Sequence, residues 1–298
     1  MRTGSSQAEQ PAQRGLIRLP PAFFVAEEFT GALARLGLTS PNAIFAFDSG
    51  RDLAKPSIGR FRQRMVFELK PAGSEHPVKV FLKRYDRPPV LRQLRNWLCH
   101  RVRRSFARIE HETAEQLAAA GINTPRTIAW GEQRSCLFER RSFLMTEEIP
   151  DSQSLERGLP ACFTGPPTSG NLRARRAFIH RLASFIQRFH ETGYRHRDLY
   201  LSHIFCSENS AFSLIDLARA SRPILQRRFQ IKDLAQLHYS APAQHVSRTD
   251  RLRFYLAYAG RPGLLPRDKV FLRTILRKAG RMARHNVKHG IRVPYRER

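Results

Sequence analysis

The chain has 298 residues, enough to bury a sizeable core in one or two domains. A hydrophobic content of 41% and an aromatic content of 10% exclude a disordered chain and predict a globular protein. The 52 Lys and Arg residues outnumber the 25 Asp and Glu residues, which gives a net charge of +27. Such a charge predicts an anionic partner, and nucleic acid, anionic lipid and an acidic glycan all satisfy it.

The expected compartment follows from the cysteines and from the hydropathy of the chain. Four cysteines are present, at Cys99, Cys136, Cys162 and Cys206. They show no CxxC or Cys/His ligand spacing, so a reducing compartment is expected and a zinc site is not. Residues 1–15 are polar and residues 16–25 are interrupted by Pro and Arg, so no signal peptide is expected. No apolar run approaches the ~20 residues of a membrane-spanning helix. We expect a cytoplasmic protein, soluble or peripheral on the membrane.

The first half of the chain combines short strands with a few helices. Residues 1–20 are expected to be disordered. Helices are expected at residues 27–38 and 109–120, near the stop signals Gly37 and Gly121. Alternating apolar residues predict strands, with a hairpin loop at 71–77. The predicted strands lie at residues 43–47, 63–70, 78–83, 128–130, 137–139 and 142–148.

A basic segment at residues 91–108 interrupts this pattern. Its apolar residues recur near helical spacing, and six arginines surround them. This composition is typical of an amphipathic helix on an anionic membrane surface, and it also fits an ordinary helix with a solvated face. The apolar positions are Leu91, Leu94, Leu98, Val102 and Phe106.

The second half is mainly helical. Residues 150–170 are rich in Pro, Gly and Ser and are expected to form a hinge or linker. Apolar residues at helical spacing predict helices beyond it, at residues 173–190, 232–240, 250–259 and 266–287. The prediction is therefore an α+β, bilobal chain, with a strand-rich lobe at 21–149 and a mainly helical lobe at 150–298.

The most informative stretch lies at residues 194–204. The helix at 173–190 ends just before it, and a polar loop follows that contains Asp198. Strands are expected at 204–206 and 212–217, and the second contains Asp216, eighteen positions after Asp198. Phosphoryl transfer needs such a pair, because one carboxylate orients the attacking hydroxyl and another holds a divalent cation against the phosphates.

Three strings in this order carry a resemblance to a known family. They are HRDLYLSHIF from His196, LIDLARA from Leu214 and KDLAQLHYS from Lys232. The first two resemble the catalytic core of the protein-kinase-like superfamily. The three together are similar to the lipopolysaccharide core kinases, bacterial enzymes that phosphorylate heptose or Kdo sugars of the inner core. The resemblance covers roughly residues 60–240 and implies a protein-kinase-like fold.

The resemblance also implies roles for individual residues. Asp198 would be the general base for the sugar hydroxyl, and Asp216 would hold Mg²⁺. Lys83, at the end of the strand at 78–83, would grip the phosphates of ATP, with Lys79 on the same face as the competitor. Glu110 would be the acidic partner of that lysine.

Two alternatives remain open around these roles. Glu112 competes with Glu110 as the partner of the lysine. His203 stands where most kinases have an Asn that helps to hold metal, and the lipopolysaccharide kinases share this His. His203 would ligate the metal, donate to a phosphate oxygen or support the loop. We expect His196 to be structural.

The resemblance implies an ATP-dependent, Mg²⁺-requiring kinase that phosphorylates a core sugar at the inner face of the cell membrane. Its partners would be the lipopolysaccharide core oligosaccharide and an anionic membrane surface. The alternatives are a kinase of another small-molecule or protein hydroxyl, and a non-catalytic basic pseudokinase that binds an anionic partner. The sequence has no zinc spacing or RNP-like aromatic string, so nucleic acid is not the expected partner.

Overall fold

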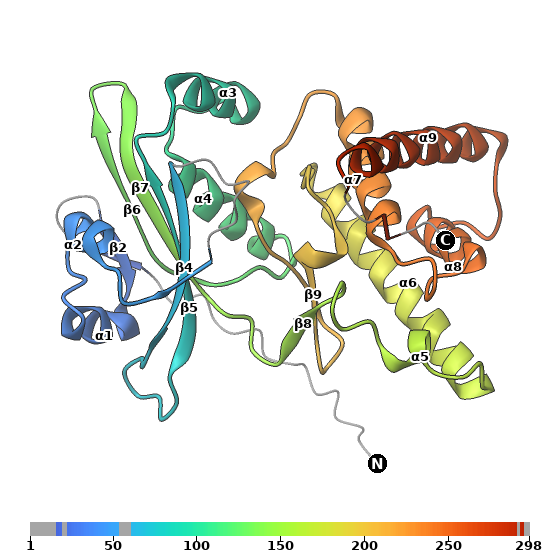
Figure 1. Ribbon diagram of the computed structural model, residues 1–298, viewed down its shortest axis with the longest axis horizontal. Coiled ribbons are helices and arrows are strands. Elements are labelled where there is room, and N and C mark those ends of the chain that lie inside the picture. The colour runs from blue at the N-terminus through green and yellow to red at the C-terminus, as the bar shows by residue number, and fades with distance from the viewer. Residues whose placement is uncertain (1–15, 20–22, 54–60, 291–292, 295–298) are drawn as a thin grey trace, which may run out of the picture. The chain divides into compact units, whose positions relative to one another are not determined.

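The computed structural model describes residues 16–19, 23–53, 61–290 and 293–294 (Figure 1). Contacts divide the chain into two compact units, one of residues 1–93 and 126–148 and the other of residues 94–125 and 149–298. The sequence predicts a single boundary near residue 149. The difference arises because Ala114 and Leu117 pack in the hydrophobic core of the second unit.

The first unit is built on one antiparallel sheet. Val80 and Leu82 of β5 are buried on one face, whereas Lys79, Phe81 and Lys83 alternate with them, as the sequence predicts. The strand order is β1-β2-β6-β7-β5-β4-β3, so β5 lies between β4 and β7. The strands are β1 Leu16–Leu19, β2 Phe23–Ala26, β3 Arg51–Asp52, β4 Arg62–Leu69, β5 Val78–Asp86, β6 Thr127–Ser135 and β7 Phe138–Glu147.

Strands β1 to β3 were not expected. Of the segment predicted to be disordered, Leu16–Leu19 form β1, and residues 1–15 and 20 lie outside the described residues. The three short strands predicted between 128 and 148 are in fact the two long strands β6 and β7. They pair closely around the turn at Cys136, whose φ of 51° reverses the chain.

Two short helices pack on the first-unit sheet. They are η1 with α1 (Glu27–Phe29 and Thr30–Arg35) and α2 (Pro41–Ala46). The strand predicted at 43–47 is wrong. The Ser40 hydroxyl accepts a hydrogen bond from the Ala43 backbone N–H, and Pro41 stands in the first turn, so the chain starts a helix there.

The basic segment forms two helices instead of one. Helix α3 (Val90–His100) ends at Arg101, whose φ of 57° interrupts the helical path. Helix α4 (Phe106–Ala119) begins where the Ser105 hydroxyl accepts the Arg108 backbone N–H at 3.2 Å. The predicted stripe therefore ends at Leu98, and Val102 and Phe106 do not continue it.

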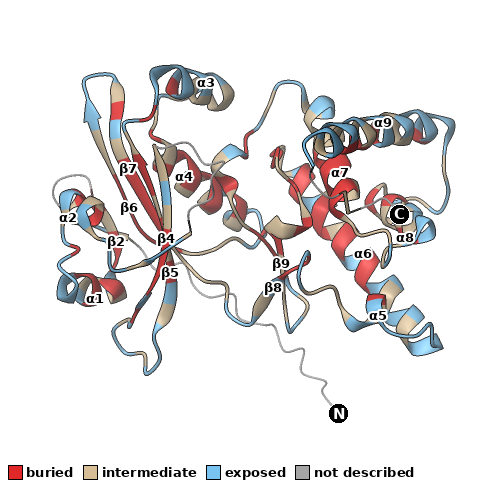
Figure 2. Ribbon diagram, viewed as in Figure 1, coloured by how far each residue is buried: buried red, intermediate tan, exposed pale blue. Residues whose placement is uncertain are grey.

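The second unit packs around helix α6 (Ser169–Glu191), which confirms the helix predicted at 173–190. This helix buries a stripe of apolar residues, Phe178, Leu182, Phe185, Ile186 and Phe189. In Figure 2 this stripe is red along α6. A small sheet follows the order β10-β9-β8, and helix α6 packs against α8 and α7 against α9. The other elements are α5 Ala161–Thr164, α7 Gln226–Ser240, α8 Arg248–Tyr258, α9 Pro266–Lys288, β8 Ser152–Ser154, β9 Ile204–Ser207, β10 Phe212–Leu214, η2 Leu201–His203 and η3 Leu217–Arg219.

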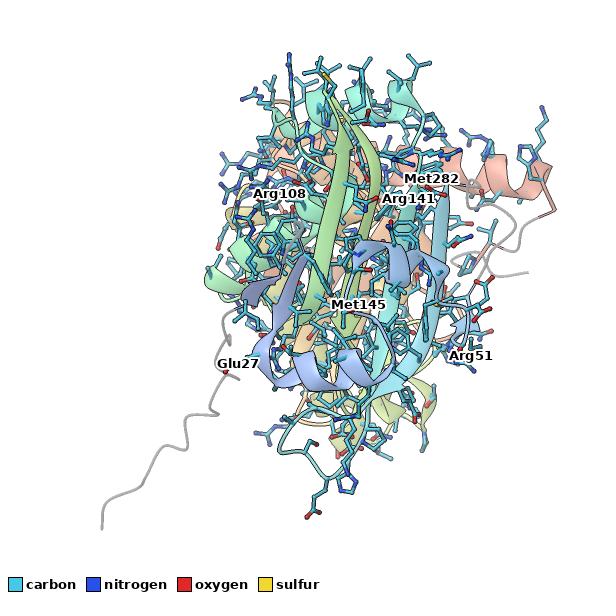
Figure 3. All side chains as sticks on the ribbon, turned by 90° about the vertical axis from the view of Figure 1, so that its left-hand side faces the viewer. Glu27, Arg51, Arg108, Arg141, Met145 and Met282 are labelled. Atoms are coloured by element: carbon cyan, nitrogen blue, oxygen red, sulfur yellow. The ribbon has the colours of Figure 1, made fainter. Side chains whose placement is uncertain are left out.

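The segment 150–170, expected to be a linker, contains β8 and α5. It is fixed because Leu155 and Phe163 are buried in the core of the second unit. Basic side chains project from elements throughout the described chain (Figure 3). Within the described ranges, no helix combines the length and the apolar character needed to cross a bilayer.

Candidate active site

Helix α7 holds the loop that contains Asp198 through a buried carboxylate. Asp233 is fully buried and accepts the backbone N–H groups of His196 at 2.8 Å and of Arg197 at 2.7 Å. Arg197 adopts a φ of 68°, a left-handed conformation that is costly for a residue with a side chain. The two hydrogen bonds from Asp233 stabilise this conformation.

Two further side chains of α7 continue this contact. Gln236 Oε1 accepts the Leu199 N–H at 3.1 Å, and Ser240 Oγ accepts the Leu201 N–H at 3.0 Å. Asp233, Gln236 and Ser240 are spaced i, i+3 and i+7, so they share one face of the helix. This polar face of α7 satisfies four backbone donors of the loop, and it fixes the peptide groups on both sides of Asp198.

The Asp198 carboxylate itself is left partly open. Its side chain is 24% exposed, and both of its oxygens accept hydrogen bonds from Arg219, at 3.0 and 2.9 Å. Lys232 Nζ lies 3.6 Å from Oδ1, and Gln236 Nε2 lies 3.4 Å from it. The carboxylate therefore faces solvent in a cationic setting, which suits a group that must meet both a hydroxyl and phosphates.

Lys232 is held beside this carboxylate by its own hydrogen bond. Its ammonium group donates to the Arg197 carbonyl oxygen, which also accepts from Gln236 Nε2 at 3.1 Å. Burial lowers the pKa of Lys232, and the nearby Asp198 carboxylate opposes this change. A partly desolvated cation next to the site interacts more strongly with phosphate than a solvated one does.

The two histidines of the loop have different surroundings. His196 is completely buried, and its Nε2 lies 3.0 Å from the Ile215 carbonyl oxygen. Burial lowers the pKa of its imidazole, followed by the effect of His203, so the neutral ring is favoured. The expectation that His196 is structural agrees with this position.

His203 Nδ1 lies 2.7 Å from the backbone carbonyl oxygen of Asp198. Because a carbonyl only accepts, Nδ1 carries the proton, and Nε2 of the neutral ring has a lone pair. The His203 carbonyl in turn accepts the Ile215 N–H at 3.1 Å, so the residue before Asp216 is tied to His203. The hairpin between β9 and β10 thus brings His203 and the Asp216 backbone together.

The sequence predicted Asp216 within a strand at 212–217. In the structure, β10 ends at Leu214, and Asp216 lies just beyond it. It caps η3 with a φ of 58° and a ψ of 58°, a conformation that Asp tolerates better than most residues do. Within the described ranges, no three His, Cys, Asp or Glu side chains gather as a metal cluster. A single carboxylate such as that of Asp216 still fits Mg²⁺, because this ion usually takes one or two carboxylates together with substrate phosphates.

The nucleotide-binding residues predicted in the first unit lie on β5. Lys83 stands opposite Arg64 of β4 and Leu144 of β7, in the middle of the sheet. Its competitor Lys79 forms an ion pair with Glu148 at 3.2 Å, and both side chains are about half exposed. This pair lies on the surface, which leaves Lys83 as the more central of the two lysines.

Helix α4 distinguishes the two candidate glutamates. Glu110 is buried, whereas Glu112 accepts hydrogen bonds from Arg104 and, at 2.9 Å, from Arg108. Helix α4 also packs against η3, the turn that follows Asp216. Glu112 is thus engaged by neighbouring arginines, and Glu110 is the inward-facing carboxylate.

Five residues of the site have no role assigned from the sequence. Four of them, Lys232, Asp233, Gln236 and Ser240, lie in the string that begins at Lys232, and the fifth, Arg219, lies in the string that begins at Leu214. A signal was present, because the polar residues of the string at Lys232 recur at helical spacing among buried apolar ones. The pattern does not show that the α7 residues contact the loop 34 to 39 residues earlier in the chain.

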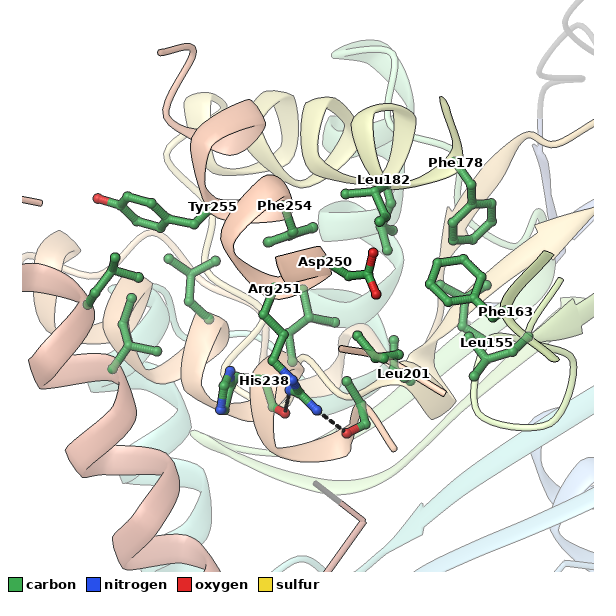
Figure 4. A pocket seen from close by; sticks show the side chains of 18 residues that line it. Leu155, Phe163, Phe178, Leu182, Leu201, His238, Asp250, Arg251, Phe254 and Tyr255 are labelled. Atoms are coloured by element: carbon green, nitrogen blue, oxygen red, sulfur yellow. Dashed lines mark hydrogen bonds between the residues drawn. The ribbon is translucent and has the colours of Figure 1, made fainter. Parts of the chain in front are cut away.

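An apolar cavity of about 110 Å³ lies elsewhere in the second unit (Figure 4). Phe163 and Phe178 line one side of it, and Phe254 and Tyr255 line another. Its polar side chains include Asp250 and Arg251, and Arg251 donates hydrogen bonds to the backbone carbonyls of His238 and Ala241. The cavity suits a hydrocarbon group better than a sugar.

An antiparallel sheet, a helical unit and a fixed Asp loop followed by a hairpin and a second Asp define a protein-kinase-like phosphotransferase. The solved structures agree: one described as WaaP in complex with acyl carrier protein matches with a TM-score of 0.63 at 25% identity, covering 87% of this chain and 98% of that chain. The profile of the lipopolysaccharide kinase (Kdo/WaaP) family matches residues 69–258, and the chain belongs to this family. The predicted fold class and the predicted phosphotransferase with an alcohol acceptor are confirmed.

Two characterised relatives have the same description, lipopolysaccharide core heptose(I) kinase WaaP. The protein from Pseudomonas aeruginosa is 31% identical over 194 residues, which cover 62% of this chain and 71% of the relative. The protein from Escherichia coli K12 is 29% identical over 209 residues, which cover 67% and 76%. The aligned segments span most of each relative.

Proposed function

We propose that this protein transfers the γ-phosphoryl group of ATP to a heptose hydroxyl of the lipopolysaccharide inner core. The family match and the two heptose(I) kinases support the substrate class. The observation that carries the chemistry is the loop held by the polar face of α7, because it binds backbone N–H groups on both sides of Asp198 but leaves the carboxylate accessible.

Asp198 is the proposed general base. It takes the proton of the attacking sugar hydroxyl while that oxygen bonds to the γ-phosphorus and ADP departs. Arg219 occupies both carboxylate oxygens in the structure, but its side chain is 52% exposed. Exposed ion pairs are worth only about 0–1 kcal/mol, so the acceptor can displace this contact. The displaced guanidinium then lies next to the transferred phosphoryl group.

Lys232 is proposed to stabilise the same phosphoryl group. Its ammonium is fixed by the Arg197 carbonyl and lies beside Asp198, so it can bind a phosphate oxygen without rearrangement. Asp216 and the Nε2 atom of His203 are the proposed ligands of Mg²⁺. When bound, this ion would neutralise charge on the phosphates.

Lys83 of the first unit is proposed to hold the ATP phosphates, and Glu110, on α4 of the second unit, is proposed as the acidic partner of this lysine. The central place of Lys83 in the sheet and the burial of Glu110 support these roles. The acceptor is anchored in a membrane through its lipid, so we also propose that the protein acts at the inner face of the cell membrane.

The test is transfer of label from γ-labelled ATP in the presence of Mg²⁺. Three acceptors are compared: core oligosaccharide that contains heptose but lacks its phosphate, a truncated core with Kdo alone, and a generic protein. We expect only the heptose acceptor to be labelled. Labelling of the Kdo acceptor would contradict the choice of sugar, and labelling of the protein alone would contradict the substrate class.

An acyl carrier protein is proposed as a second partner. The similar solved structure contains one, and the apolar cavity of the second unit offers room for hydrocarbon. Binding is measured by calorimetry with acylated and unacylated carrier protein. The substitution Ala241→Phe fills the cavity, and we expect it to weaken binding of the acylated form only. If the acylated and the unacylated carrier protein bind equally well to the wild type and to Ala241→Phe, this role is contradicted.

A further inference from the structure

Helix α3 presents a stripe of apolar side chains to solvent. Leu91 and Leu98 are each 80% exposed, and Val90 and Leu94 are also exposed. At about 100° per residue, these four positions fall within an arc of roughly 100° on one face of the helix. Most of α3 is accordingly pale blue in Figure 2. We call these four residues the α3 stripe.

The exposure of the stripe results from how the helix is anchored. Gln93 is buried, and its Nε2 donates to the carbonyl oxygens of Pro88 at 2.8 Å and of Glu139 at 3.1 Å. Its Oε1 accepts the Glu139 N–H at 2.8 Å. Trp97 Nε1 donates to the Arg104 carbonyl oxygen at 3.0 Å. On the helix, Gln93 lies about 60° and Trp97 about 20° from Val90, on one flank of the stripe. These hydrogen bonds anchor that flank of α3, and the stripe beside it stays in solvent.

Basic side chains flank the stripe. Arg95 lies beside it, about 40° from Leu91 on the helix, and Arg92 lies about 100° from Leu91 on the same side. Arg101 follows the helix end, and all three arginines are exposed. Helix α3 contains no Asp or Glu. An exposed apolar stripe beside arginines is the pattern of a helix that lies in the interface of an anionic bilayer.

We propose that α3 binds an anionic lipid surface, with the α3 stripe inserted among the acyl chains and the arginines at the headgroup phosphates. The charge distribution favours this occupant over a second copy of the chain. In a two-fold contact, the arginines of one copy would face those of the other without compensation. A nucleic acid would engage the arginines but would leave the leucines in water.

The test is co-sedimentation of the full-length protein with vesicles, without ATP or acceptor sugar. Vesicles of phosphatidylcholine alone are compared with vesicles that also contain phosphatidylglycerol. We expect binding to the anionic vesicles to fall about tenfold or more in Leu91→Gln/Leu98→Gln, because two apolar side chains are lost from the bilayer. Arg92→Gln/Arg95→Gln should lower it by a similar factor, and salt should weaken the binding that remains.

Matched substitutions on other helices serve as controls. Leu172→Gln/Leu276→Gln removes exposed leucines from α6 and α9, and Arg273→Gln/Arg277→Gln removes exposed arginines from α9. We expect both control proteins to bind nearly as well as the wild type. Equal loss in the controls would show that net charge alone drives binding, and it would overturn the assignment to α3.

Two other outcomes would also overturn the proposal. One is vesicle binding that the α3 substitutions leave unchanged. The other is a change of oligomeric state in Leu91→Gln/Leu98→Gln, measured by analytical ultracentrifugation, without any change in vesicle binding. Because the measurement involves no phosphate transfer, its failure is separate from a failure of the proposed kinase activity.

Discussion

The catalytic loop and helix α3 use the same device for different purposes. In each, a buried polar side chain, Asp233 or Gln93, binds backbone groups of another segment and fixes the local geometry. In the loop this leaves the carboxylate of Asp198 open, and in α3 it leaves Leu91 and Leu98 open. The buried polar anchors thus determine the local structure in both regions, and the exposed groups are available for function.

The largest expected effect is on the open carboxylate of the loop. Asp198→Asn should reduce kcat by about 100- to 10,000-fold, because the amide cannot accept the proton of the acceptor hydroxyl. Its free energy of unfolding should stay within about 1 kcal/mol of wild type, since the carboxylate is partly exposed. Steady-state kinetics and urea denaturation measure the two effects. Glu208→Gln, an exposed position in the β9–β10 turn, is the control.

A substitution of Asp233, which anchors the loop, should lower the stability of the fold, unlike the substitution of Asp198. Asp233→Asn places an amide N–H against one of the two backbone N–H groups that Asp233 accepts. We expect the free energy of unfolding to fall by about 2–4 kcal/mol, because a buried donor loses its partner. Urea denaturation measures this change. A stability equal to that of Asp198→Asn would contradict the division between anchor and functional group.

Lys232 combines the roles of anchor and functional group. It binds the Arg197 carbonyl, and it also faces Asp198. Lys232→Met removes the charge but keeps most of the side-chain volume. We expect kcat to fall about 10- to 100-fold, with KM for the acceptor changed less, because the charge acts on the phosphoryl group. A change confined to KM would instead assign Lys232 to acceptor binding.

Buried histidines should make the fold sensitive to acid. Burial, with a contribution from Arg251, lowers the pKa of His238 in α7 to about 4, below the unfolded value of about 6.5. Its stabilising effect is therefore complete above pH 6.5 and is lost as the pH falls towards 4. At pH 5 the resulting loss in the free energy of unfolding is about 1–2 kcal/mol. Urea titrations at pH 7 and 5 should show a smaller pH effect in His238→Gln, whereas His76→Gln, an exposed position, should match wild type.

The smallest effect concerns the stability of α3. Leu91→Gln/Leu98→Gln should change the free energy of unfolding by less than about 0.5 kcal/mol, because both side chains are already in water. Gln93→Leu should destabilise the protein by about 1–3 kcal/mol, since the Glu139 N–H and carbonyl lose their partners. Thermal unfolding of the two variants side by side tests the comparison directly.

The candidate site was largely predictable where the chemistry is local. Asp198, Asp216 and His203 lie within one stretch of loop and hairpin, so their order along the chain already places them together. Their individual roles and those of Lys83 and Glu110 remain predictions. Helix α2 stands where a strand is predicted at 43–47, because the Ser40 cap and Pro41 start a helix there. A local capping signal outweighed the pattern there.

The fold class, the family and the spacing of the two aspartates follow from the sequence alone, because they depend on local motifs and on periodic burial. Which carboxylate is open and which is an anchor follows from tertiary contacts, since Asp198 and Asp233 are both acids in polar strings. Helix α7 contacts the loop 34 to 39 residues away along the chain, and no local pattern specifies that pairing. For the same reason, the sequence predicted an apolar stripe on α3, but only the hydrogen bonds of Gln93 show that the stripe faces solvent.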